Sequence, residues 1–193
     1  MMVHLVHGVG INDRSCPAKI EGKNTKEYYL WVGMLERCYS KAYLEKRPTY
    51  VGCSVSDNFK NYSYFYSWCK NQVGFNVAGF SLDKDLLCKG NKQYSETHCV
   101  FIPNTINLLL TNCKAARGVL PIGVTKAANK FRAQCTIEGI NKYIGLFDTP
   151  TLAFEAYKAF KEDNIKHIAE KYKAIIDHRA YLALLNYEVS IDD

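Results

Sequence analysis

The first half of the chain alternates between irregular polar stretches and segments whose apolar residues recur at helical spacing. Apolar side chains repeat every three or four positions from Leu30 to Tyr39, which predicts a helix over about 27–43. A second such pattern runs from Phe59 to Cys69 behind the N-cap candidates Ser56 and Asp57. It predicts a second helix with one aromatic face. Residues 1–25 have no such period and are expected to form an irregular arm.

The apolar period changes in the middle of the chain. Two short segments, 80–87 and 99–102, flank a polar loop and are predicted to form a pair of strands. A third, short helix is expected over 105–112. Gly, Pro and basic residues then fill 114–122, a composition typical of a linker. The order strand, loop, strand, helix is therefore predicted just before the linker.

Strict alternation replaces the helical period after the linker. Apolar residues at 131, 133 and 135 are expected on one face of a strand, with polar residues on the other face. A turn is expected at Glu138-Gly139, and a further strand over 142–147. The pattern predicts three short antiparallel strands in this half.

A long helix is expected to follow the sheet, starting near Pro150 and capped by Asp148 or Thr149. Its apolar stripe continues to about Ile176, and the last residues suit another short helix and a tail. The prediction is an α+β protein with a first domain over 1–113, a linker over 114–122 and a second domain over 123–193. The second domain is expected to be a three-stranded antiparallel sheet packed on a helix.

Composition narrows the class of protein without defining it. The chain has 193 residues, 48% of them hydrophobic, and a formal net charge of +6, so it can bury a core and bind a polyanion. No apolar run approaches the ~18 residues that cross a bilayer, and the first residues do not resemble a secretion signal. The eight cysteines form no C-x-x-C pair, so no zinc site is predicted and buried free thiols are expected.

The polar face of the second domain carries candidate chemistry for nucleic acid. Arg can address guanine with two hydrogen bonds, Gln can address adenine, and Lys reaches phosphates. A strand face that is merely solvated would have a similar pattern, and the residues alone do not separate the two interpretations. The outward candidates are Lys130, Arg132, Gln134, Thr136 and Lys142.

A family resemblance supports the first interpretation. The segment from Gly123 to Phe160 resembles the AP2-type DNA-binding domain of phage and mobile-element endonucleases. The resemblance rests on Gly123-Val124, Phe131-Arg132-Ala133, the turn 145–149, Ala153 and Ala156-Tyr157. It implies a sheet laid in the major groove of double-stranded DNA. The implied contacts are Lys126, Lys130, Arg132, Gln134, Thr136 and Lys142.

The predicted hairpin of the first domain carries a second set of candidates. Asp83 and Asp85 supply carboxylates, Asn107 an amide and His98 an imidazole. A hard cation such as Mg²⁺ needs only one or two protein oxygens, and it can stabilise a leaving alkoxide during phosphodiester cleavage. The alternative is that these residues end strands, form turns or cap a helix.

The first domain resembles phage HNH-like, homing-type endonucleases. The resemblance rests on LDKDLLCKGNKQYS and CVFIPNTIN, preceded by WVGMLERCYS, RPTYVGC and YFYSWCKNQ. The resemblance implies a ββα-metal hairpin in which Asp83 binds a divalent cation such as Mg²⁺ and Asn107 completes the metal site. It places His98 where the family often has an Asn that orients the general base. The implied activity is metal-dependent hydrolysis of DNA in the cytoplasm of a host cell.

Lys84 departs from the family pattern, because it stands where the family has its general-base histidine. A lysine side chain is an ammonium at neutral pH and therefore a poor base. Lys84 could instead position water or neutralise a phosphate, or His98 could act as the base. A hairpin without activity is the other interpretation. The protein would then be a DNA-binding regulator, or an inhibitor of a host nuclease or defence complex.

Overall fold

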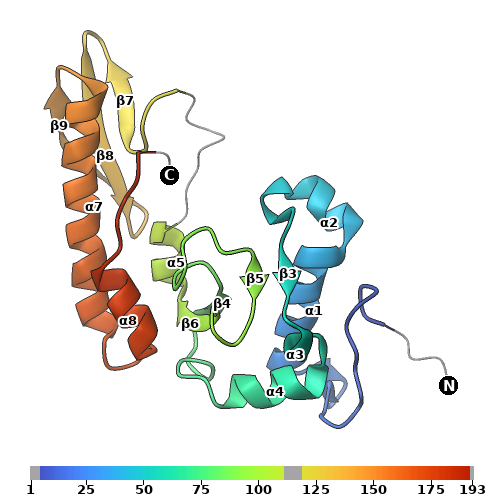
Figure 1. The fold of residues 1–193 in the computed structure, drawn as a ribbon. Helices are drawn as coiled ribbons and strands as arrows, with labels where there is room; N and C mark the ends of the chain where they lie inside the picture. Colours follow the sequence, from blue (N-terminus) through green and yellow to red (C-terminus); the bar gives the residue numbers. More distant parts are fainter. Residues whose placement is uncertain (1–4, 111–118, 192–193) are drawn as a thin grey trace. The chain divides into compact units, whose positions relative to one another are not determined.

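The computed structural model describes residues 5–110 and 119–191, and it divides the chain into two compact units (Figure 1). The units are Met1–Phe101 and Ile102–Asp193. Helices and short sheets occur in both, which confirms the predicted α+β class. The boundary between the units along the chain falls between Phe101 and Ile102, whereas the sequence predicted a boundary after residue 113. Most of the expected linker, residues 114–118, lies outside the described residues.

Short elements build the first unit. Its paired strands are β1 with β2 (antiparallel), β3 with β5 (parallel) and β4 with β6. The helical elements are α1 (Lys26–Tyr39), α2 (Lys41–Lys46), η1 (Pro48–Tyr50), α3 (Asp57–Lys60) and α4 (Tyr62–Lys70). The strands are β1 (Lys19–Ile20), β2 (Lys23–Asn24), β3 (Ser54–Val55), β4 (Phe80–Asp83), β5 (Gln93–Tyr94) and β6 (Val100–Pro103), the last of which crosses the boundary.

Each of the two long helices predicted for this unit is broken by one polar residue. At Ser40 the backbone is extended and the hydroxyl accepts from the backbone N–H of Tyr43, so α1 ends and α2 begins. At Asn61 the side chain caps α4, and the backbone on either side bonds to Ile11 instead of continuing the helix: Ile11 donates to the carbonyl of Lys60 and accepts from the N–H of Tyr62. Side chains that offer the backbone another partner compete with helix continuation, which the apolar period does not reveal.

An aromatic core holds the first unit together. Trp31, Phe59 and Phe65 are fully buried, and the rings of Phe59 and Phe65 meet edge to face at 5.1 Å. The Trp31 indole also donates to the carbonyl of Phe59 at 2.8 Å, which satisfies its buried N–H. The irregular arm joins this core at Gly10, where a Cβ atom would lie 2.3 Å from Leu35. The arm is therefore packed, and it is not irregular throughout as predicted, because β1 and β2 form a short antiparallel pair within it.

The cysteines in the described residues are free thiols, and five of the seven are buried. Burial raises the pKa of Cys38 and of Cys99 to about 12, so these thiols stay protonated at neutral pH. They serve as small core residues, as the sequence predicted. Cys88 is exposed, and Cys113 lies outside the described residues.

The second unit is a three-stranded antiparallel sheet, in the order β7-β8-β9, covered on one face by the long helix α7 (Figure 1). Glu138 and Gly139 form the turn between β8 and β9 with positive φ angles, as the sequence predicted. Thr149 caps α7, with Pro150 in the first turn. The elements are α5 (Asn104–Leu110), β7 (Val124–Ala127), β8 (Lys130–Ile137), β9 (Ile140–Phe147), α7 (Pro150–Tyr172) and α8 (His178–Leu185).

Several predicted boundaries differ from the structure. β4 ends at Asp83 rather than near residue 87, because the Asp83 carboxylate turns the following backbone. α7 ends at Tyr172, while Ile176 is buried beyond it in a turn before α8. None of the helices within residues 5–110 and 119–191 has the length and apolar character needed to cross a membrane.

Candidate nucleic-acid interface and the Asp83 hairpin

The sheet of the second unit has one face packed on α7 and one open face. Ala133 and Cys135 on β8 are buried against the helix. Arg132 and Gln134 alternate with them, so they point to the other side. Cross-strand partners share a face, which adds the partners of these two residues to the open face. The register pairs are Thr125 with Arg132, Arg132 with Leu146, Gln134 with Tyr143, and Thr136 with Asn141.

Four of the six predicted DNA contacts lie on this open face, namely Lys130, Arg132, Gln134 and Thr136. The other two do not share it. Lys126 pairs with Phe131, and Lys142 pairs with Cys135, so the register assigns both to the side that α7 covers. Both lysines are nevertheless exposed, because β7 and β9 are the edge strands of the sheet.

Three residues on β9 join the open face without having been predicted from the sequence: Asn141, Tyr143 and Leu146. For Asn141 and Tyr143 the cause is a β-bulge, since Ala133 pairs with Gly145 while the next residue of β8 pairs with Tyr143. One extra residue inverts the alternation along the rest of a strand. Counting back from Phe147 in steps of two would have turned Tyr143 toward the helix.

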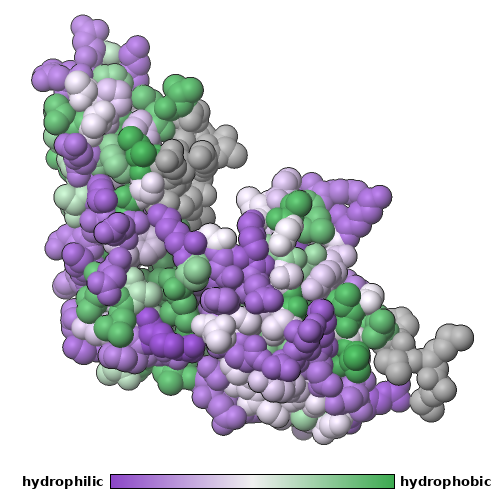
Figure 2. All heavy atoms as spheres, viewed as in Figure 1, coloured by the Kyte–Doolittle hydropathy of each residue, from purple (hydrophilic) through white to green (hydrophobic). Residues whose placement is uncertain are grey.

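The side chains on the open face are turned toward solvent. Within the described residues, the side chains of Arg132, Gln134 and Tyr143 form no hydrogen bond or ion pair, and Tyr143 is 63% exposed. Lys130 pairs with Asp148 at 3.1 Å, an exposed contact of little strength. Figure 2 shows hydrophilic and hydrophobic side chains interspersed over the visible surface of this unit. The open face therefore combines guanidinium, amide, hydroxyl and phenol donors with one exposed leucine.

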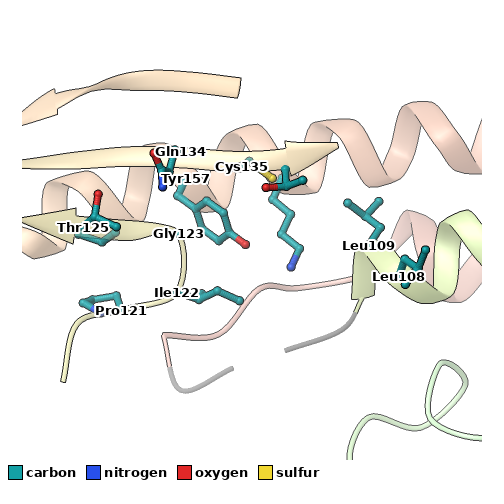
Figure 3. A pocket seen from close by; sticks show the side chains of 12 residues that line it. Leu108, Leu109, Pro121, Ile122, Gly123, Thr125, Gln134, Cys135 and Tyr157 are labelled. Atoms are coloured by element: carbon teal, nitrogen blue, oxygen red, sulfur yellow. The ribbon is translucent and has the colours of Figure 1, made fainter. Parts of the chain in front are cut away.

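A cavity of about 480 Å³ lies beside the start of β7 in this sheet (Figure 3). β7 begins there, and just before it the N–H of Gln134 donates to the carbonyl of Gly123 at 2.9 Å. Gly123 has a φ angle of +75°, and a Cβ atom would lie 2.0 Å from the Tyr157 ring. The cavity is lined by Leu108, Leu109, Pro121, Ile122, Gly123, Val124, Thr125, Gln134, Cys135, Thr136, Tyr157 and Lys161.

In the first unit, Asp83 ends β4 and makes a turn with one of its two carboxylate oxygens. Its Oδ1 accepts from the backbone N–H groups of Asp85 at 2.9 Å and Leu86 at 2.7 Å. Its Oδ2 has no hydrogen bond within the described residues. Burial raises the pKa of Asp83 despite these bonds. A nearby cation would offset this cost, so the free oxygen suits a metal ligand.

Lys84 is buried and fastened to the loop that follows it. Its Nζ donates to Asp85 Oδ1 at 2.5 Å and to the carbonyl of Asn91 at 2.9 Å. The Asn91 amide donates in return to the carbonyl of Lys84 at 2.8 Å. An ammonium that donates to a carboxylate has no electron pair to accept a proton. The geometry therefore gives Lys84 a structural part in this loop, rather than that of a general base.

The remaining hairpin candidates do not converge on Lys84 in the described structure. His98 is half-buried, and its Nδ1 lies 2.9 Å from Ser95 Oγ in the turn before β6. The resemblance placed His98 where the family often has an asparagine, but the asparagine that contacts Lys84 is Asn91. Asn107 lies on α5 in the second unit, whereas Asp83 lies in the first, so each is described within its own unit.

The fold and the two candidate sites define an α+β protein with an open-faced sheet in one unit and a carboxylate-bearing strand end in the other. Comparison with protein-family models, with curated proteins and with solved structures finds no match. Across residues 5–110 and 119–191, no three His, Cys, Asp or Glu side chains gather as a metal cluster. A Mg²⁺ site with one carboxylate and one amide would not form such a cluster.

Proposed function

We propose that this protein binds double-stranded DNA through the open face of β7, β8 and β9. The observation that carries the proposal is the set of hydrogen-bonding side chains on this face that bond to nothing else in the described chain. A twisted two- or three-stranded surface of this kind fits the width of the major groove. The positive net charge favours a polyanionic partner and its rapid association.

Each side chain on the face has a part that its chemistry suits. Arg132 can donate two hydrogen bonds to guanine, and Gln134 can pair with adenine. Leu146 offers an apolar contact for a thymine methyl group. Lys130 is the member best placed for a backbone phosphate, because its exposed pair with Asp148 is easily exchanged.

The test is duplex binding by fluorescence anisotropy with the full chain. Arg132→Ala is expected to weaken binding by about 1–3 kcal/mol and to relax sequence preference at one position. Lys166→Ala is the matched control, because it removes one positive charge from an exposed site on α7, away from the open face. Equal losses in the two variants would reduce the interaction to net charge and contradict the proposal.

We propose phosphodiester hydrolysis at Asp83 as a second activity. The observation that favours it is the half-buried carboxylate whose Oδ2 is unbonded and whose pKa is raised by burial, at the end of a strand paired with β6. A Mg²⁺-class ion would be held by the Asp83 carboxylate, with water and a substrate phosphate as its other ligands. Such an ion would supply Lewis-acid stabilisation of the leaving oxygen. Because Lys84 is engaged by Asp85, His98 is the better candidate for the base.

Nicking of supercoiled plasmid with Mg²⁺ or Mn²⁺ tests this activity. Asp83→Asn is expected to abolish nicking while leaving duplex binding intact, because Asn retains the oxygen that caps the turn. Asp57→Asn, at an exposed carboxylate of the same unit, is the control. Duplex binding without nicking in the wild type would reject the hydrolase and favour a non-catalytic DNA-binding regulator or inhibitor.

A further inference from the structure

A group of cations and tyrosines in the first unit lies beside the Asp83 hairpin, which contributes Lys84 to it. Arg37 near the end of α1 donates from Nε to the Tyr94 hydroxyl at 3.1 Å. Lys84 makes a cation–π contact with the same tyrosine, with its Nζ 5.7 Å from the centre of the Tyr94 ring. Tyr43 and Tyr50 stack edge to face with ring centres 5.7 Å apart. Tyr94 is thus the buried centre of a polar group drawn from α1, α2, η1 and β5.

The donors of this group are only partly used. A guanidinium has five N–H groups, and the Nε–H is the one that Arg37 uses among the described residues. The hydroxyls of Tyr43 and Tyr50 likewise make no hydrogen bond within residues 5–110 and 119–191. These three side chains are half-buried, so each keeps part of its surface exposed to solvent. A partly desolvated guanidinium with idle donors is the usual arrangement for binding a carboxylate or a phosphate.

The local charge favours an anion. Burial opposes the charge on Arg37, but the neighbouring hydroxyls of Tyr94, Tyr50 and Tyr43 outweigh it, and the pKa of Arg37 is raised. Asp85 is the negative group that also faces Tyr50, and it is neutralised by Lys84 at 2.5 Å. With that pair cancelled, Arg37 leaves the group with one positive charge.

We propose that Arg37, Tyr43 and Tyr50 form a binding site for a phosphodiester group of the DNA backbone. The terminal guanidinium nitrogens take two phosphate oxygens, and the tyrosine hydroxyls donate to the same group. This inference rests on the proposed function, because it takes DNA as the source of the phosphate. It gives the first unit a backbone contact independent of sequence, whereas the sheet of the second unit reads bases.

The salt dependence of duplex binding by the full chain tests the site. Arg37→Gln is expected to lower the slope of log affinity against log salt by about one and to weaken binding equally on all sequences. Tyr50→Phe removes one hydroxyl but keeps the ring, and it is expected to weaken binding several-fold with the slope unchanged. Lys19→Gln, at an exposed position on β1, is the control for net charge. A slope for Arg37→Gln equal to that of the control overturns the site.

The same assay separates this site from the open face. Weaker binding by Arg132→Ala with an unchanged Arg37→Gln would leave the proposed function standing and remove the phosphate site. The reverse pattern would remove the base-reading face and keep the phosphate site. Arg37→Lys guards against a folding artefact, because it keeps the charge and can still reach Tyr94. It is expected to retain the wild-type slope with reduced affinity.

If the wild type binds no duplex, a titration with inorganic phosphate tests whether Arg37 belongs to a phosphate-binding site. The Nε–H resonance of Arg37 is followed by NMR during a phosphate titration, with the Nε–H of Arg132 as reference. A saturating shift at Arg37 alone supports a phosphate site that serves another phosphate ester. Equal, non-saturating shifts at both residues overturn the proposal.

Discussion

Two regions of the molecule carry polar side chains in similar numbers and use them in opposite ways. In the loop from Lys84 to Asn91, the polar groups bond to one another: the ammonium to a carbonyl and a carboxylate, and the amide to two carbonyls. On the open face of β7–β9, Arg132 and Gln134 have no side-chain partner within the described residues. The first region satisfies its own hydrogen bonds, and the second leaves them for a ligand.

The contrast shows that residue type alone does not identify a site. Lys84 was predicted to occupy a catalytic position, yet it is buried and bonded to its own loop. Tyr143 was not a candidate, yet it is exposed on the face most suited to a ligand. Buried polar groups are costly unless paired, so a fully bonded one usually serves the fold. Exposed donors cost the fold little and remain free to bind.

The largest expected effect is a loss of stability in the second unit, which contains the open-faced sheet, with the loop of the first unit left unchanged. Gly123→Ala forces a side chain into a left-handed backbone position and against the Tyr157 ring, 2.0 Å away. Strain and overpacking together are expected to destabilise the second unit by about 2–5 kcal/mol. Thermal unfolding followed by near-ultraviolet circular dichroism measures the loss. Gly139→Ala has the same sign of φ but open space, and a loss as large there would show that backbone strain, not contact with Tyr157, is responsible.

The next effect tests whether the loop really uses its polar groups internally. Asn91→Ala removes donors to the carbonyls of Lys84 and Gln93 and leaves the N–H of Gln93 unpaired. The expected cost is about 2–3 kcal/mol of unfolding free energy. Asn141→Ala on the open face removes an exposed asparagine side chain and is expected to cost under about 0.5 kcal/mol. Equal costs in urea unfolding would erase the distinction between the two regions.

Sequence reasoning succeeded where the signal was local and periodic. The alternation of Phe131, Ala133 and Cys135 and the turn at Glu138-Gly139 were predicted and are confirmed. Of the two predicted caps of the long helix, Asp148 and Thr149, the structure has Thr149. It failed where a single residue changed the course of the backbone. Ser40 and Asn61 each divide a predicted helix, and their side-chain bonds to the backbone leave no trace in the apolar period.

The candidate sites were predictable in part. Arg132 and Gln134 followed from simple alternation, but Tyr143 did not, because the bulge opposite Ala133 inverts the strand beyond it. The structural part of Lys84 depends on Asn91, seven residues away across a loop with no regular period. Such contacts require the three-dimensional path of the chain, which neither spacing nor composition encodes.

A moderate effect on duplex binding is expected at Tyr143, which was not predicted from the sequence. Tyr143→Ala is expected to weaken duplex binding by about 1 kcal/mol, because an exposed ring on the face loses its contact area, while the unfolding free energy changes little. Tyr29→Ala provides the control, since Tyr29 is 73% exposed on α1 in the other unit. Anisotropy titrations of both variants decide the matter. Weakened binding by Tyr29→Ala alone would move the interface to the first unit.

The smallest effect concerns Asp83, the half-buried carboxylate at the end of β4. Because burial raises the pKa of Asp83 in the folded state, its ionised form disfavours folding, and the penalty is relieved as pH falls toward the unfolded value. Asp83→Asn is therefore expected to be slightly more stable than the wild type at pH 7, with the difference shrinking toward pH 4. Added Mg²⁺ is expected to narrow the difference at pH 7 by stabilising the wild type alone.

The pKa of Asp57 is shifted in the opposite direction to that of Asp83, which makes Asp57 a useful comparison. Its hydrogen bond to Lys60 holds its pKa below the ordinary value, so its ionised form favours folding. Asp57→Asn is thus expected to be less stable than the wild type near neutral pH, with the deficit disappearing as pH falls through the lowered pKa. Urea unfolding from pH 3 to 8 measures both curves. If Asp83→Asn followed the Asp57→Asn curve, the Asp83 carboxylate would be a satisfied turn residue, and the reason for assigning it a cation would be lost.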